Sequence, residues 1–308
     1  MPSPTALEDI RSLVVPELER ETLRVLGADA KSWLNGVLSC DVSQLSKARG
    51  TYGLLLNKQG KIQAELDLVE ADDGSVLLGV SAGRGELVRA QLDRVLVMED
   101  AEISLEPNLR WLRFYGPEAG VGARAVVGAL GSGAIDWVGL GGVALVVRDV
   151  DAEAALQTAV AAGSERVSPE RWSVLRIRRG FPCYGGDFSD EDNPHEASLD
   201  RRAVSWTKGC YLGQEVVCMQ DMRGRVKRRV VALELDGGAT ILPESEVESP
   251  GEAGPVGRIT SSASDGVAAV ALARLKFPFF EGKHPLSVAG RNARILAPAP
   301  PGDGSFKS

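Results

Sequence analysis

Eight consecutive residues bring together the side chains of this sequence that are best suited to chemistry. Residues 208–215, which we call the octet, read Lys-Gly-Cys-Tyr-Leu-Gly-Gln-Glu and supply an amine, a thiol, a phenol, an amide and a carboxylate. Gly209 and Gly213 would allow positive φ angles and the close approach of a ligand. Lys208 stands one glycine away from Cys210, and a nearby ammonium lowers the pKa of a thiol and increases its nucleophilic thiolate fraction.

A second interpretation of the octet is purely structural. Free cysteine is often a small, buried and inert side chain. The octet would then be a tight turn before a helix, with Cys210 packed in the core. The residue types alone leave both interpretations open.

The octet, followed by Val216 and Val217, resembles the KGCY-x-GQE motif of the YgfZ family of folate-binding, GcvT-like proteins that support iron-sulfur enzymes. The resemblance implies an α+β fold, a GcvT-like ring of ferredoxin-like units followed by a C-terminal β-barrel. It implies tetrahydrofolate or a one-carbon derivative as ligand, and iron-sulfur client enzymes or assembly factors as partners. It also implies catalytic roles for Cys210 and for Lys208, which would polarise the thiol. Ligand contacts within the octet would come from Tyr211, Gln214 and Glu215.

Length, charge and cysteine spacing argue against several other classes of protein. A chain of 308 residues is long enough for two or three units with their own cores. The net charge of −7 argues against a broad nucleic-acid-binding face. No apolar run approaches the ~20 residues of a membrane helix, and the first residues do not resemble a secretion signal, so we expect a cytoplasmic protein. No metal site is expected, because the cysteines lack paired spacing: Cys40, Cys183, Cys210 and Cys218.

A hairpin with a polar face is predicted before the middle of the chain. Residues 51–57 and 62–69 read as two strands, and Gln63, Glu65 and Asp67 share one face of the second. That face either meets solvent or forms one wall of a wet cavity. In the related aminomethyltransferases this hairpin carries Asp-Asp-Leu near folate, whereas residues 64–66 here read Ala-Glu-Leu. Glu65 stays a candidate ligand contact by this resemblance.

The middle of the chain adds a second departure from those transferases. Residues 175–180, Tyr184-Gly185 and residues 194–197 resemble the middle of the GcvT-like fold, and Tyr184 could stack on a pterin. Where the transferases carry a glutamate that grips the pterin, this chain has Arg178. An arginine only donates hydrogen bonds, so the pterin would be recognised differently. Alternatively, Arg178 belongs to a cationic helix end that complements the helix dipole.

A basic cluster follows the octet between Arg223 and Arg229. It is either a strand edge protected by positive charge or an anion site, in which Arg223 would meet the glutamate tail of folate.

The remaining segments complete the expected architecture. Helices are expected over 86–97, after Pro117, over 151–162 and from Pro169, where Ser168 is the cap. The glycines of 139–142 precede a strand-like run, not a helix, so we reject a dinucleotide loop there. Short strand-like runs over 226–235, 253–261, 267–275 and 286–296 predict a small barrel or sandwich. The expected organisation is a folate-binding region over 1–224, a barrel over 225–297 and a disordered tail over 298–308.

Three functions follow from these observations. The first is a YgfZ-like factor that assists assembly or repair of iron-sulfur clusters in client enzymes, including tRNA-modifying ones, and that is not a conventional enzyme. The second is a folate-dependent aminomethyltransferase of the glycine cleavage type. The third is a folate-binding module with no thiol chemistry. Cys218 could resolve an oxidised Cys210 in the first case, although the neighbouring valines suggest a buried segment.

Overall fold

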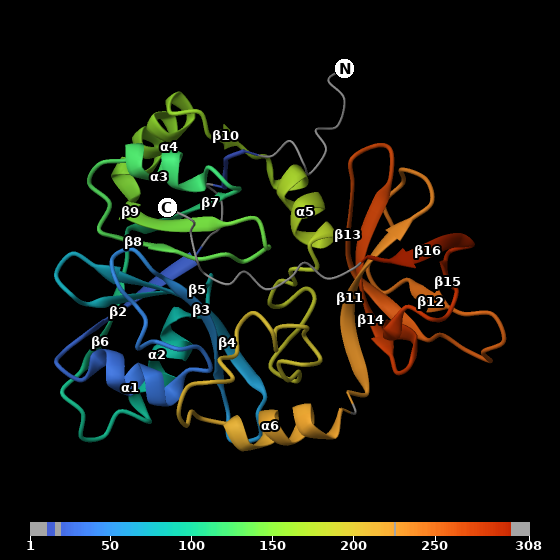
Figure 1. Ribbon diagram of the computed structural model, residues 1–308, viewed down its shortest axis with the longest axis horizontal. Helices are drawn as coiled ribbons and strands as arrows, with labels where there is room; N and C mark the ends of the chain where they lie inside the picture. The colour runs from blue at the N-terminus through green and yellow to red at the C-terminus, as the bar shows by residue number, and fades with distance from the viewer. Residues whose placement is uncertain (1–10, 16–19, 225, 297–308) are drawn as a thin grey trace.

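The computed structural model describes residues 11–15, 20–224 and 226–296. It contains a sheet-based body and a separate barrel, with α5 between them (Figure 1). The expected tail over 298–308 lies outside the described residues.

The first unit of the body is built around the predicted hairpin. Strands β3 and β4 form the hairpin. Strands β5, β2 and β6 follow β4 in that order across the sheet. The strands are β2 (Arg20–Leu26), β3 (Thr51–Leu56), β4 (Ile62–Ala71), β5 (Val76–Ser81) and β6 (Glu102–Glu106), with helices α1 (Ala30–Val37) and α2 (Gly85–Asp93).

The second unit repeats this combination of strands and helices. It contains β1 (Leu13–Val15), β7 (Leu109–Tyr115), β8 (Gly131–Ala134), β9 (Gly142–Arg148) and β10 (Glu165–Arg166), with α3 (Ala119–Ala125), η2 (Asp149–Asp151) and α4 (Ala152–Ala161). Pairing of β4 with β8 joins both units into one ten-stranded sheet. The glycines of 139–142 lead into strand β9, so the rejection of a dinucleotide loop is confirmed.

The third part of the chain is a closed barrel. Its strand order is β11-β14-β13-β12-β15-β16, with all neighbours antiparallel. The elements are β11 (Arg228–Leu235), β12 (Glu246–Glu248), β13 (Gly257–Ser264), β14 (Ala269–Lys276), η3 (Phe279–Glu281), β15 (Leu286–Val288) and β16 (Arg291–Ile295). The predicted α+β fold with a C-terminal barrel is therefore confirmed, and the sandwich alternative is wrong.

Helix α5 (Pro169–Arg178) connects the body to the barrel. Ser168 accepts a hydrogen bond from the backbone N–H of Arg171, and Pro169 occupies the first turn, as expected. Arg178 at the other end donates to Asp265 in the β13–β14 turn over 2.6 Å. This arginine therefore fastens α5 to the barrel. An irregular stretch over 179–213 then leads to α6 (Gln214–Arg223).

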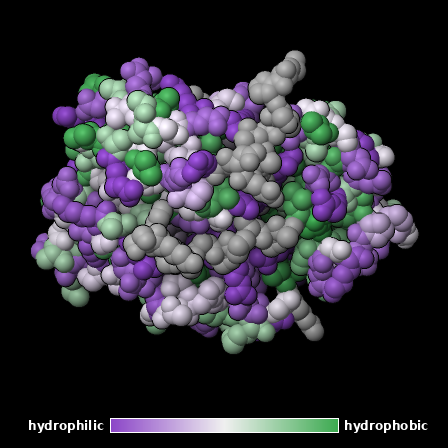
Figure 2. Space-filling model, turned by 45° about the horizontal axis from the view of Figure 1, so that its top comes forward, coloured by the Kyte–Doolittle hydropathy of each residue, from purple (hydrophilic) through white to green (hydrophobic). Residues whose placement is uncertain are grey.

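The surface mixes hydrophilic and hydrophobic residues on the face that Figure 2 shows. Within the described part of the chain, no helix is long and apolar enough to cross a membrane.

A buried ionic network connects the two units of the body. Asp67 of β4 is fully buried, and its carboxylate forms an ion pair with Arg20 of β2 over 3.1 Å and accepts a hydrogen bond from Arg113 of β7. The indole N–H of Trp137 donates to the same carboxylate over 2.7 Å. Glu65, also buried, accepts from Tyr52 and Arg20. The solvent-exposed interpretation of this strand face is therefore wrong.

Replacement of Asp67 by alanine should cost the fold about 3–5 kcal/mol, because two buried guanidinium groups would lose their shared counter-charge. Urea unfolding followed by circular dichroism measures this loss. As a control, Asp72→Ala removes only the exposed pair with Lys47 and should cost less than about 1 kcal/mol. Equal losses in the two variants would contradict the importance of the network.

Candidate functional site

The first six residues of the octet form a loop that ends on the hairpin turn between β3 and β4, and Gln214 and Glu215 begin α6. Gly213 has φ +81° and precedes the first residue of α6. A Cβ atom at Gly213 would lie 2.5 Å from the carbonyl oxygen of Asn57 in the hairpin turn. Tyr211 and Val217 are buried in the main core of the body. Glycine at 213 is therefore required both by backbone conformation and by close contact.

Cys210 lies at the surface of this loop. It is exposed, whereas Cys40 is buried and Cys183 and Cys218 are partly exposed. Burial raises the pKa of the Cys40 and Cys183 thiols to about 11, so both stay protonated at neutral pH. The interpretation of Cys210 as a buried, inert side chain is therefore wrong. An exposed thiol is free to meet another molecule.

Lys208 anchors the loop to the end of helix α1. Its ammonium donates to the backbone carbonyls of Asn35, Leu38 and Cys40 over 2.6, 2.6 and 2.7 Å. These bonds use all three ammonium hydrogens on carbonyls at and just beyond the C-terminal end of α1, where a cation is also favoured by the helix dipole. Partial burial lowers the pKa of Lys208. The expected polarisation of Cys210 by Lys208 stays a prediction, because this geometry supports an anchoring role.

Three other predicted ligand contacts lie in different surroundings. Glu65 is occupied within the ionic network, and Tyr184 lies under the guanidinium of Arg84 at 4.5 Å. Arg223 is exposed in the last turn of α6, at the opposite end of the helix from Gln214 and Glu215. Their roles in binding a ligand stay predictions.

The motif around His195 holds α6 in place. His195 is buried, and its Nε2 lies 3.3 Å from a carboxylate oxygen of Asp221 in α6. Glu196 accepts from Arg228, the first residue of the barrel. This part of the chain therefore braces the helix that follows the octet.

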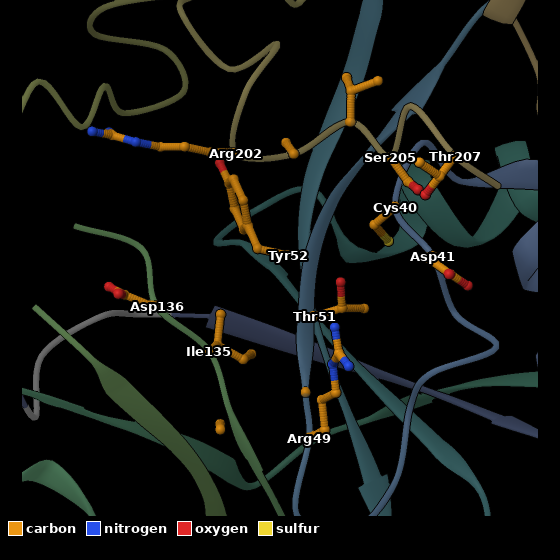
Figure 3. A pocket seen from close by; sticks show the side chains of 14 residues that line it. Cys40, Asp41, Arg49, Thr51, Tyr52, Ile135, Asp136, Arg202, Ser205 and Thr207 are labelled. Atoms are coloured by element: carbon orange, nitrogen blue, oxygen red, sulfur yellow. The ribbon is translucent and has the colours of Figure 1, made fainter. Parts of the chain in front are cut away.

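A polar cavity of about 270 Å³ lies beside the segment that leads into the octet (Figure 3). Thr51, Ser205 and Thr207 gather on the Cys40 side of this cavity. Tyr52, Arg202 and Asp136 lie toward its other side, and Arg49 lies near Thr51. The cavity therefore combines hydroxyls, cations and carboxylates from parts of the chain that are far apart in sequence.

Several polar groups of this cavity are available to a ligand. One oxygen of Asp136 accepts three backbone N–H bonds from residues 138–140, and the other forms none with the described residues. The side chain of Arg49 has no hydrogen-bond partner within the same part of the chain. Tyr52 links the cavity to the ionic network, since its hydroxyl donates to Glu65 over 2.5 Å.

Sequence reasoning missed this cavity, although one local signal was present. Ser205 and Thr207 place two hydroxyls immediately before Lys208. The other walls come from residues after α1, around the start of β3 and around the end of β8, and nothing in the local sequence shows that these segments meet.

Comparison with known proteins first defines the fold. The glycine cleavage system aminomethyltransferase T from Bartonella henselae matches with a TM-score of 0.76, over 96% of this chain and 88% of that chain, at 17% identity. The chain therefore has the aminomethyltransferase fold.

The comparison of sequences is more specific. The tRNA-modifying protein YgfZ of Klebsiella pneumoniae is 25% identical over 233 residues, 72% of this chain and 70% of that protein. The protein of the same name from Aliivibrio fischeri is 28% identical over 238 residues, 73% of this chain and 72% of that protein. No protein-family model matches. The resemblance to YgfZ proteins inferred from the octet is confirmed.

Replacing Lys208 by methionine should destabilise the protein by about 2 kcal/mol, because three partly buried carbonyls lose a charged donor. Urea unfolding gives the free energy, and limited proteolysis should show faster cleavage within 205–213. Lys58→Met, in the exposed turn of the hairpin, is the matched control and should change neither property. If Lys208→Met matches the wild type in both measurements, the anchoring role is wrong.

Proposed function

We propose that this chain is a YgfZ-like, folate-binding cytoplasmic protein that supports assembly or repair of iron-sulfur clusters in client enzymes, including those that modify tRNA. Similarity to YgfZ proteins over about 72% of the chain and the aminomethyltransferase fold support the proposal. The observation that carries it is the exposed Cys210 on an anchored loop.

The chemistry of the polar cavity suits the head group of a reduced folate. A pterin presents both donors and acceptors, and the cavity offers a carboxylate oxygen of Asp136, the guanidinium of Arg49 and the hydroxyls of Thr51 and Thr207. Tyr52 adds an aromatic wall. When bound, tetrahydrofolate would supply the nitrogen atoms that carry one-carbon units. The residues of the polar cavity suit the binding of a folate head group better than Glu65, Tyr184 and Arg223, which do not line this cavity.

The Cys210 thiol has three chemical roles open to it. A thiolate can act as a redox group, as a transient cluster ligand or as a nucleophile. Each role requires contact with another molecule, and surface exposure permits that contact. Cys218 is partly exposed within α6 and is the candidate for resolving an oxidised Cys210.

An aminomethyltransferase of the glycine cleavage type is the second candidate, favoured by the structural match. Two positions argue against it. Glu65 is held by Tyr52 and Arg20, and Arg178, which stands where the transferases carry a glutamate, is paired with Asp265. Neither position offers a free carboxylate to a pterin. Formation of methylene-tetrahydrofolate from an aminomethylated lipoyl carrier would reverse this ranking.

Cys210→Ser should abolish rescue of a bacterial strain that lacks its own YgfZ and whose iron-sulfur enzymes fail under oxidative stress. The substitution removes the thiol at an exposed position and should leave folding unchanged, which thermal unfolding and immunoblotting verify. Growth under oxidative stress and the extent of tRNA modification are the measurements.

Cys183→Ala is the control for a thiol that stays protonated and does not line the polar cavity, and it should retain rescue if the variant folds. If Cys210→Ser rescues as well as wild type, the protein acts as a folate-binding module without thiol chemistry. That outcome would overturn the assignment of Cys210.

A further inference from the structure

We propose that a groove beside helix α3 binds small amphipathic molecules with an apolar body and one anionic head group. The groove has a volume of about 590 Å³ and lies between α3, strands β8 and β9, and residues 47–48. Its volume is within the range of small-molecule sites, which are mostly apolar with a few polar groups. The proposal is independent of folate and of Cys210.

The groove exists because the strand and the helix that border it carry small side chains. Strand β8 reads Gly-Ser-Gly-Ala, and α3 reads Ala-Gly-Val-Gly-Ala-Arg-Ala. Ser132 and Ala134 of β8 stand opposite Leu145 and Val143 of β9, and all four residues line the groove. Among the residues that the structure describes, no large side chain fills the space between β8 and the helix, so apolar surface is left open to a ligand.

The charges at the rim favour an anionic head group. Lys47 pairs with Asp72 over 3.0 Å, and Glu118 pairs with Arg11 over 2.6 Å. Arg124 lines the same groove and is exposed, and it has no carboxylate partner among the described residues. The rim therefore keeps one uncompensated positive charge, which complements a carboxylate, sulfonate or phosphate.

The groove lies close to the polar cavity but is distinct from it. Ala134 lines both of them. Its backbone N–H donates to the carbonyl of Ala48, and its carbonyl accepts from the backbone N–H of Gly50. Hydrophobic residues appear among hydrophilic ones at the surface over the corner where α3 and α4 lie (Figure 2). Exposed apolar side chains there include Val121.

Decanoate tests the proposal directly, because it has an apolar chain and one carboxylate. Calorimetric titration of the full chain below the micellar concentration should show saturable binding of one decanoate per chain. Decyltrimethylammonium has the same chain length and the opposite charge, and should bind more weakly.

Two variants locate the site. The three atoms nearest to a Cβ atom built at Gly120 all belong to the flexible guanidinium of Arg124, so Gly120→Leu can be accommodated and should obstruct the groove. This variant should lose measurable decanoate binding while its thermal stability is kept. Arg124→Gln should weaken binding about two- to fivefold, as expected for one exposed charge.

Arg148→Gln is the matched control, because this exposed arginine pairs with Asp151 and does not line the groove. It should bind decanoate like wild type. The proposal is overturned if decanoate shows no saturable binding, if Gly120→Leu binds as wild type does, or if the cationic probe binds as tightly as decanoate. None of these outcomes affects the proposal for Cys210.

Discussion

The structure depends on one constraint: the negative charges of two buried carboxylates must be neutralised by neighbouring arginines. Glu65 and Asp67 lie on one face of β4, and a charge removed from water must be paired and hydrogen-bonded. Arg20 comes from the same unit and Arg113 from the other. The network therefore fixes how the two units meet across the sheet. It also fixes β4 and the hairpin turn that precedes it, against which Gly213 packs.

The same network changes what the fold can do. Arg20, Tyr52 and Ser81 already donate to the carboxylate of Glu65, so most of its acceptor capacity is used inside the protein. Arg178 is committed to the contact between α5 and the barrel. This chain thus combines the aminomethyltransferase fold with interior contacts that occupy both of these positions. The exposed features that distinguish this chain are the octet thiol and the segment that anchors it.

Local pattern was sufficient for many elements of the fold. The hairpin was visible from its alternation and turn, α5 from Ser168 and Pro169, and most barrel strands from apolar runs between turns. Short elements and exposed ends of elements were harder to predict from the sequence. Strand β12 has three residues and was missed, and α2 ends at Asp93 instead of Val97, which is exposed beyond it. The octet revealed the resemblance, but its anchor could not be predicted, because Lys208 contacts carbonyls about 170 positions earlier. The cavity likewise depends on segments that only the fold brings together.

Hydrogen-deuterium exchange of the full chain, with and without tetrahydrofolate, tests most directly whether the cavity beside the octet is the folate site. We expect slower exchange in the backbone around 49–52, 134–136 and 202–207 when the ligand is present. Protection confined to the regions of Tyr184 and Arg223, or no protection at saturating ligand, would contradict the account.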